Sequence, residues 1–281
     1  MTRTLMPADQ LADSAKSGLS LPSSTGRVLA LQVAGSVLLF GVWELLVRLG
    51  VIQGFLFGQP SGIVSSFVMR LGNGSLILDT WLTVYEALIG FVVGTILGAS
   101  SGLALWYSTA VARIVEPLIV ALNSVPKVAL APIVILWFGT GLFSKIALAV
   151  SLTSLVALIA AYQAAKDADP DLQSLLFSMG ADKHRIFTRV VVPCSLPFII
   201  ATFRINIGFA LVGAVVGEFI TSQHGLGHLI FTASSFYDLN GVWVGIFTLM
   251  IVGFMFYFVI DYIERGLLPW KMKTSVQKFQ L

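Results

Sequence analysis

Long apolar stretches alternate with short polar segments along this 281-residue chain. Crossing the hydrocarbon core of a bilayer takes about 20 apolar residues. Four windows with at most one charged residue meet this requirement: 28–47, 87–107, 146–165 and 239–260. Two further windows, near 115–138 and 195–220, are interrupted by Lys127 and Arg204. The pattern therefore predicts six transmembrane helices.

The composition supports a membrane protein and sets the fold class. Hydrophobic residues make up 57% of the chain and charged residues only 11%, whereas a soluble domain carries about 25% charged residues. Backbone polar groups in lipid need internal partners, and the apolar runs are too long for the strands of a barrel. We expect an all-α, polytopic membrane protein with six transmembrane helices.

Charged and turn-forming residues set the expected boundaries. A polar, Ser-rich tail (1–26) has no short apolar core of a signal peptide, so it reads as a cytoplasmic extension. A single membrane domain (27–270) follows, and a second cytoplasmic tail (271–281) ends the chain. The expected helices are 28–48, 80–107, 112–138, 145–165, 195–220 and 240–263. An additional short helix is expected on the outer surface, beginning after Gln59 at "PSGIVSSFVMRL".

Basic residues predict the orientation, because cytoplasmic loops carry an excess of Lys and Arg. With a cytoplasmic N-terminus, only three basic residues lie on the outer side: Arg48, Arg70 and Lys145. Twelve lie on the cytoplasmic side: Arg3, Lys16, Arg27, Arg113, Lys166, Lys183, Arg185, Arg189, Arg265, Lys271, Lys273 and Lys278. We expect both termini in the cytoplasm. The net charge of +3 is then a topology signal and gives no indication of nucleic-acid binding.

An amphipathic, charged segment (171–192) separates the fourth and fifth predicted helices. Its apolar residues follow helical i, i+3, i+4, i+7 spacing: Leu172, Leu175, Leu176 and Met179. Asp169 and Asp171 flank Pro170, which suits a helix start, and Gly180 suits a helix stop. A helix pair of this kind either rests on lipid headgroups or docks into a groove of a soluble partner. Periodicity alone does not choose between these readings.

Several ordered blocks resemble a known family. Gly180 and the following "IFTRVVVPCSLPFIIATFRINIGFALVGAVVGEF" resemble the signature loop of binding-protein-dependent ABC importer permeases. Four more blocks resemble the nitrate/sulfonate/taurine branch: "NSVPKVALAPIVILWFGTGLFSK" (123–145), "VVGEF" (215–219), "GLGHLI" (225–230) and "ERGLLPW" (264–270). The resemblance runs from about residue 60 to residue 270.

This resemblance implies a type I ABC importer in the bacterial plasma (inner) membrane. Its expected partners are a second permease subunit in a homodimer, two cytoplasmic ABC ATPase subunits, an extracytoplasmic solute-binding protein and membrane lipid. ATP and Mg are expected on the ATPase, because the chain has no P-loop motif. We therefore expect a transport subunit that is not an enzyme and holds no cofactor.

The family's signature loop is a coupling helix that fits a cleft on the ATPase. Carried onto this sequence, it implies ATPase-coupling roles for Leu172, Ser174, Leu175, Leu176, Met179, Gly180, Ala181 and Arg185. The family usually has Glu-Ala-Ala where this chain has Ser174, Leu175 and Leu176. An ion pair from that glutamate cannot be transferred to this chain. The two leucines imply a more apolar contact.

Three ionisable residues inside the predicted spans are candidates for the translocation pathway: Lys127, Arg204 and Glu218. Such residues are costly in a membrane and mark a pathway or a paired structural site. A cationic lining from Lys127 and Arg204 would suit an anionic solute. The structural alternatives are that Lys127 bonds carbonyls freed by Pro126, that Arg204 snorkels to the cytoplasmic face, and that Glu218 sits in a helix interface.

Other sites find little support in the sequence. His224 and His228 have i, i+4 spacing, but Gly225 and Gly227 disfavour a helix there and no third ligand follows, so we expect no metal site. The single cysteine, Cys194, allows no disulfide within the chain. Gly90, Gly94 and Gly98 have the small-xxx-small spacing of closely packed membrane helices.

The sequence thus predicts the permease subunit of an ATP-driven uptake transporter for a small anionic solute such as nitrate, a sulfonate or taurine. One alternative is a permease of the same family for a non-anionic solute, such as a thiamine-precursor pyrimidine. Another is a secondary transporter, which would need buried coupling-ion sites and usually internal repeats. Neither of these features is visible in the sequence.

Overall fold

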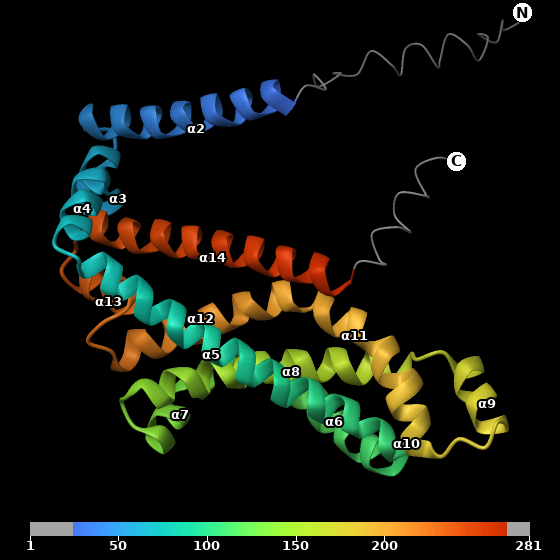
Figure 1. Cartoon of the computed structure of the whole chain (residues 1–281). Helices are drawn as coiled ribbons and strands as arrows, with labels where there is room; N and C mark the ends of the chain where they lie inside the picture. Colours follow the sequence, from blue (N-terminus) through green and yellow to red (C-terminus); the bar gives the residue numbers. More distant parts are fainter. Residues whose placement is uncertain (1–24, 269–281) are drawn as a thin grey trace, which may run out of the picture. The chain divides into compact units, whose positions relative to one another are not determined.

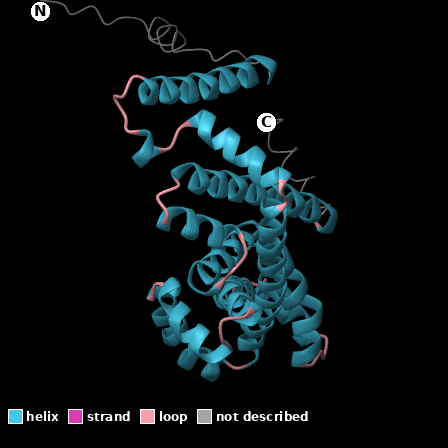
Figure 2. Ribbon diagram, turned by 90° about the vertical axis from the view of Figure 1, so that its left-hand side faces the viewer, coloured by secondary structure: helices cyan, strands magenta, loops and turns pink. Residues whose placement is uncertain are grey.

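The computed structural model describes residues 25–268, and all regular structure in this range is helical (Figure 2). The chain divides into two compact units, 1–54 and 55–281. The first unit contains α2 (Thr25–Arg48), which corresponds to the first predicted span. The predicted tails 1–26 and 271–281 lie, apart from residues 25 and 26, outside the described range. The all-α class is confirmed.

The helices of the second unit provide the remaining spans, and α3 (Gly54–Phe57) lies at the boundary between the units. Their bounds are α4 (Pro60–Gly72), α5 (Ser75–Ala104), η2 (Leu105–Tyr107), α6 (Thr109–Ser124), η3 (Lys127–Leu130), α7 (Ala131–Phe138), α8 (Leu142–Lys166), α9 (Pro170–Ser178), α10 (Lys183–Ile186), the π-helical η4 (Phe187–Val191), α11 (Val192–Ala201), α12 (Phe203–Thr221), α13 (Leu226–Ser235) and α14 (Leu239–Leu267). The outer helix predicted after Gln59 is α4. Within residues 25–268, six helices are long and apolar enough to span a membrane, and a bent pair raises the number to seven.

The prediction of one continuous helix over 112–138 was wrong. The chain forms α6 and the η3–α7 segment, which meet at an angle of 93°. Pro126 cannot continue a helix, and Val125 before it adopts the extended conformation (φ −74°, ψ 131°) that proline imposes on its predecessor. The break therefore lies one residue before Lys127.

The predicted helix over 195–220 is also divided. It consists of α11 and α12, which are separated at Thr202. The Thr202 hydroxyl donates a hydrogen bond to the carbonyl of Ile199 (2.7 Å), a back-bond that bends helices. Upstream, α11 continues through η4 into α10, so Lys183–Ala201 and Phe203–Thr221 are each apolar enough to span a membrane.

The core of the second unit is the pair α5 and α8, which run side by side (Figure 1). The predicted close approach at Gly90, Gly94 and Gly98 is confirmed, because a Cβ at any of them would overlap atoms of α8. Thr153 of α8 donates a hydrogen bond across the interface to the carbonyl of Gly90 (3.1 Å). Glycine is thus required by the helix–helix distance.

Gly94→Ala is expected to destabilise the protein, because its Cβ would overlap the Thr153 side chain. Overpacking of this kind costs about 1–3 kcal/mol. Gly208→Ala is the matched control, since Gly208 lies in α12 and has no atom near its Cβ position. Thermal unfolding of the purified chain in detergent should show a lower midpoint for the first variant only. Equal midpoints would contradict close α5–α8 packing.

Short helices lie at both ends of the second unit. Figure 1 places α9 and α10 at its right-hand end, and α4 and α13 at its left-hand end. The helices α5, α8 and α12 run between these ends. Packed helices therefore connect the two ends.

Candidate functional site

The segment 171–192 folds as two short helices around a glycine. The Asp169 carboxylate accepts hydrogen bonds from the backbone N–H groups of Asp171 (2.9 Å) and Leu172 (3.2 Å), which caps α9. Gly180 has a φ of +81°, a conformation that favours glycine. Asp182 then caps α10 by accepting from the N–H of Arg185 (3.2 Å). The predicted helix start and stop are both confirmed.

Most of the apolar stripe of α9 faces away from the rest of the second unit. Leu172, Leu175 and Met179 are exposed, and Leu176 is half-buried. Phe177 adds a further exposed ring (73%) that lies off the i, i+3, i+4 stripe. A surface of this kind normally marks an interaction site.

Three more residues of the predicted coupling set lie around this stripe. Ser174 is exposed and its hydroxyl donates to the carbonyl of Pro170 (2.8 Å). The N–H of Ala181 donates to the carbonyl of Leu176 (3.0 Å), closing the turn at Gly180. Arg185 is also exposed. These contacts fix the shape of the segment and leave its outer face free.

The second half of the segment is bonded to η2, which directly continues α5. The ammonium of Lys183 donates to the carbonyl of Tyr107 (2.7 Å), and the Tyr107 hydroxyl bonds to Nδ1 of His184 (3.1 Å). The ring of Phe187 lies 4.5 Å from that of Tyr107. These contacts link α10 and η4 to η2.

Lys127 lies at the break between α6 and α7, beside a pocket of about 330 Å³. Its ammonium donates to Oδ1 of Asn123 (3.1 Å) and lies 5.9 Å from the centre of the Phe209 ring. Leu152 and Val212 also line this pocket. Among residues 25–268, no carboxylate pairs with Lys127. An unpaired cation thus faces a partly apolar cavity.

Arg204 has a different environment. Its guanidinium contacts Oδ1 of Asp261 (2.5 Å) and Oε2 of Glu264 (2.8 Å) on α14. It also lies over the ring of Tyr257 (5.2 Å). These contacts join α12 to α14 and favour the structural alternative for Arg204 over a place in the pathway.

Glu218 is fully buried and holds the start of α13. One carboxylate oxygen accepts from the hydroxyl of Thr83 (2.6 Å) and the other from the N–H of Gly227 (2.6 Å). The Thr83 oxygen accepts from the N–H of Leu226 (2.9 Å), and Asp79 accepts from the N–H of Gly225 (2.8 Å). Three consecutive backbone donors are therefore satisfied by side chains of α5 and α12.

These bonds explain why α13 forms where the glycines disfavour a helix. The first N–H groups of a helix lack partners within it, and Gly225 provides no capping side chain. Asp79, Thr83 and Glu218 replace the missing cap from other helices. As expected, no helix joins His224 to His228, because Gly225 is non-helical and α13 begins only at Leu226.

A second contact fixes the loop before α13. The ammonium of Lys145 on α8 donates to Oε1 of Glu86 on α5 (2.9 Å) and to the hydroxyl of Ser222 (2.8 Å). Glu86 is fully buried and Lys145 is 8% exposed. We call Asp79, Thr83, Glu86, Lys145 and Glu218 the outer cluster. It connects α5, α8 and α12 to the loop 222–227.

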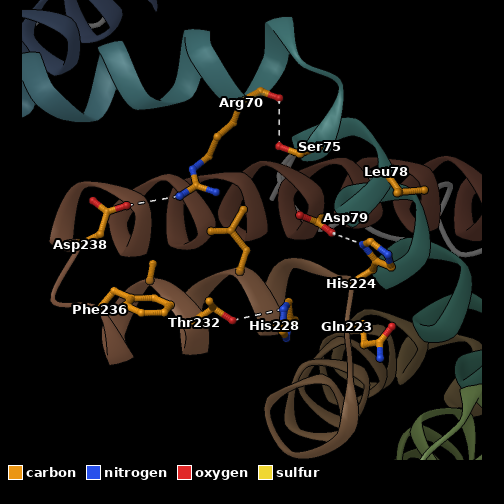
Figure 3. A pocket seen from close by; sticks show the side chains of 12 residues that line it. Arg70, Ser75, Leu78, Asp79, Gln223, His224, His228, Thr232, Phe236 and Asp238 are labelled. Atoms are coloured by element: carbon orange, nitrogen blue, oxygen red, sulfur yellow. Dashed lines mark hydrogen bonds and ion pairs between the residues drawn. The ribbon is translucent and has the colours of Figure 1, made fainter.

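A pocket of about 270 Å³ opens next to the outer cluster (Figure 3). Arg70 lines it and contacts Asp238 (3.3 Å). On the opposite side, Nδ1 of His224 lies 3.8 Å from Asp79. His228 bonds instead to Thr232 (3.2 Å) on its own helix. The pocket therefore shares Asp79 with the outer cluster.

Comparison with known proteins decides the family. Residues 90–269 match the family described as "Binding-protein-dependent transport system inner membrane component". This chain belongs to that family. The permease is 32% identical over 237 residues to the formylaminopyrimidine transport permease protein ThiX of Halalkalibacterium halodurans, which covers 84% of this chain and 94% of that protein. The predicted family resemblance is confirmed.

Other relatives of the permease carry different solute names. The riboflavin transport system permease protein RibX of Chloroflexus aurantiacus is 31% identical, covering 84% of this chain and 88% of that protein. A third relative, from Bacillus subtilis, has the provisional name aliphatic sulfonates transport permease protein SsuC. It is 29% identical, and the match covers 83% of this chain and 84% of that protein. These names do not agree on one solute.

A solved structure supports the fold of the permease. A chain of the methionine ABC transporter MetNI, in an inward-facing conformation, superimposes with a TM-score of 0.60 at 19% identity. The match covers 67% of the permease and 94% of that chain. The type I importer permease fold is confirmed, as is the prediction of a membrane-embedded transport subunit.

Sequence reasoning missed most of the outer cluster. Glu218 was singled out, but Asp79, Thr83 and Lys145 were not. Asp79 and Thr83 are spaced i, i+4, which places them on one helix face. Their bonding partners follow more than 140 residues later in the chain, so no local pattern connects them. Phe177 was also missed, because it falls outside the helical repeat.

Proposed function

We propose that this permease forms, as a homodimer, the translocation pathway of an ATP-driven uptake transporter. Two cytoplasmic ATPase subunits bind ATP and Mg, and an extracytoplasmic protein delivers the solute. Both termini and α9 lie on the cytoplasmic side, and the outer cluster lies on the opposite side. The family and fold support this assembly, and the excess of basic residues supports the orientation.

The exposed apolar face of α9 is the observation that carries this proposal. An amphipathic helix that projects from a bundle suits a groove on a partner, and the apolar side chains provide the contact. The fastening of α10 to Tyr107 passes the motion of the partner into α5. Closure of the ATPase pair then shifts the bundle between inward-open and outward-open states.

Affinity purification of the tagged, full-length permease from its native membranes tests this assembly. We expect an ATPase subunit with a P-loop to be retained in mild detergent. Recovery of the permease without any such subunit, across several detergents that keep it folded, would count against the proposal. A matched Leu175→Glu preparation shows whether retention depends on α9.

The solute that we propose is a small anion, such as nitrate, a sulfonate or taurine. Lys127 supports this choice, because its ammonium faces a pocket without a paired carboxylate. A cation within a membrane span is costly, and a bound anion compensates that cost. Asn123 and the helix break at Pro126 add polar groups beside it.

Lys127→Met is expected to lower the uptake of an anionic solute about 10- to 100-fold, because a charge-assisted hydrogen bond contributes about 1.5–3 kcal/mol. Lys127→Arg should retain most of the uptake. Lys166→Met is the control, since Lys166 is exposed and pairs with Glu116 (3.6 Å) outside this pocket. Radiolabelled taurine and nitrate uptake in cells that express the complete system measures the effect. Equal uptake by Lys127→Met and wild type would remove Lys127 from the pathway.

A non-anionic solute is the second candidate, and the names of two relatives support it. ThiX and RibX are named for a formylaminopyrimidine and for riboflavin. If the same permease handles such a solute, Lys127→Met should leave its uptake unchanged. Binding measurements on the cognate extracytoplasmic protein, with each solute class in turn, separate the two candidates.

A further inference from the structure

The outer cluster contains more buried negative than positive charge. Glu86 and Glu218 are both completely buried, and Lys145 is the one ammonium that contacts either of them among residues 25–268. All three lie in helices long enough to span a membrane. Each ion taken out of water costs several kcal/mol unless its charge is compensated. Two carboxylates and one ammonium leave one charge uncompensated.

The hydrogen bonds of the outer cluster agree with this excess of negative charge, because one buried carboxylate oxygen lacks a donor among the described residues. Both oxygens of Glu218 and Oε1 of Glu86 have donors, from Thr83, Gly227 and Lys145. Oε2 of Glu86 is buried and has no hydrogen-bond partner within the described part of the chain. Glu86 lies one turn after Thr83 on α5, and Thr83 donates to Glu218, which places the two carboxyl groups close together. Two carboxylates can bond to each other only when one of them carries a proton.

We propose that Glu86 and Glu218 bind one proton between them. The proton comes from water and forms an O–H on one carboxyl group that donates to the other. The remaining negative charge of the pair is then balanced by Lys145, and the core of the cluster becomes neutral. The proton belongs to the pair, as in other sites where two carboxylates share a buried position.

The other charged groups that face the cluster do not remove this imbalance. Asp79 on α5 is a carboxylate and adds negative charge, although it accepts from the N–H of Gly225. His224 in the loop lies beside Asp79 at 3.8 Å and is exposed to water. On α13, which also packs against the pair, His228 bonds to Thr232. The elements packed around the pair thus supply one buried ammonium for the two glutamates.

The shared proton stabilises the closed outer loop. Glu218 holds the N–H of Gly227, and Lys145 holds Ser222 while it pairs with Glu86. Loss of the proton would place two negative charges side by side and weaken both contacts. Separation of α5, α8 and α12 at this end would in turn admit water and release the proton. The pair therefore couples loop closure to protonation, independently of which solute is carried.

Difference infrared spectroscopy of the full-length permease in lipid nanodiscs tests the proposal through the carbonyl stretch of a protonated carboxylic acid. We expect this band in the wild type at neutral pH and its loss on alkaline titration. Glu86→Gln and Glu218→Gln should each abolish it, because either change leaves a single carboxylate beside Lys145. Glu116→Gln, at an exposed ion pair, should leave it unchanged.

Each result bears on the shared proton. Loss of the band in only one of the two single variants would show that one glutamate alone is protonated, and it would overturn the proposal. Persistence in both variants, or absence from the wild type at neutral pH, would do the same.

Thermal unfolding adds a second readout. The single variants should unfold close to the wild-type temperature and the double variant at a clearly lower one, because Lys145 then has no buried counter-charge. Should a variant fail to fold, absence of the band from the wild type at neutral pH would still overturn the proposal.

Discussion

Leu175→Glu is expected to abolish ATP-driven uptake while leaving the thermal unfolding midpoint of the permease unchanged. Leu175 is exposed at the centre of the apolar stripe of α9 and contributes little to the packing of the chain itself. In the proposed complex the same side chain is buried against the ATPase. A charged carboxylate there would be desolvated without a partner, which costs several kcal/mol and prevents docking.

Ser178→Glu is the matched control for this prediction. Ser178 is exposed on the same helix, lies outside the apolar stripe and receives the same charge. Uptake of radiolabelled solute and ATP hydrolysis by the reconstituted transporter give the two readouts. We expect transport and solute-stimulated hydrolysis to fail in Leu175→Glu and to persist in Ser178→Glu. Normal transport by Leu175→Glu would show that α9 rests on lipid headgroups.

Gly225→Ala is expected to destabilise the permease strongly, because it combines two penalties. Gly225 has a φ of +114°, which costs an L-residue about 1–3 kcal/mol. Its Cβ would also overlap the carboxylate of Glu218, so that buried donors lose their partner at a further cost of about 1–3 kcal/mol. The start of α13 and the outer cluster should come apart together. Thermal unfolding and hydrogen exchange at residues 225–229 measure the effect.

Gly74→Ala separates the two penalties. Gly74 has a φ of +78° but no atom near its Cβ position, so it carries the backbone penalty alone. We expect its unfolding midpoint to lie between those of the wild type and Gly225→Ala. If the two variants behave alike, the contact between Gly225 and Glu218 contributes nothing to stability.

The fold was largely predictable, because the hydrocarbon thickness imposes a length on each apolar run. Two details were missed. The break before Lys127 follows from Pro126, which the sequence shows but which membrane helices often tolerate as a kink. The division at Thr202 leaves no mark in the hydropathy of the sequence.

The two ends of the second unit differ in how well the sequence predicts them. The helix start and stop at the α9 end could be predicted from local sequence, because Asp169 and Gly180 act on their immediate neighbours. The outer cluster instead depends on bonds from Asp79 and Thr83 to a loop far along the chain. By local propensity, Gly225 and Gly227 disfavour a helix, and only their contact with Glu218 shows why α13 begins at this point. Long-range capping of this kind is invisible to local propensity.

The central claim is that the exposed face of α9 receives the ATPase, and site-specific photo-crosslinking tests it most directly. A photoreactive amino acid at position 175 reports on the partner of α9 in native membranes. The same group at Trp137, which is exposed on α7, reports on a surface away from that partner. The account predicts an adduct with a P-loop ATPase subunit from position 175 and none from position 137. Adducts with lipid alone at position 175, in membranes where uptake is active, would contradict it.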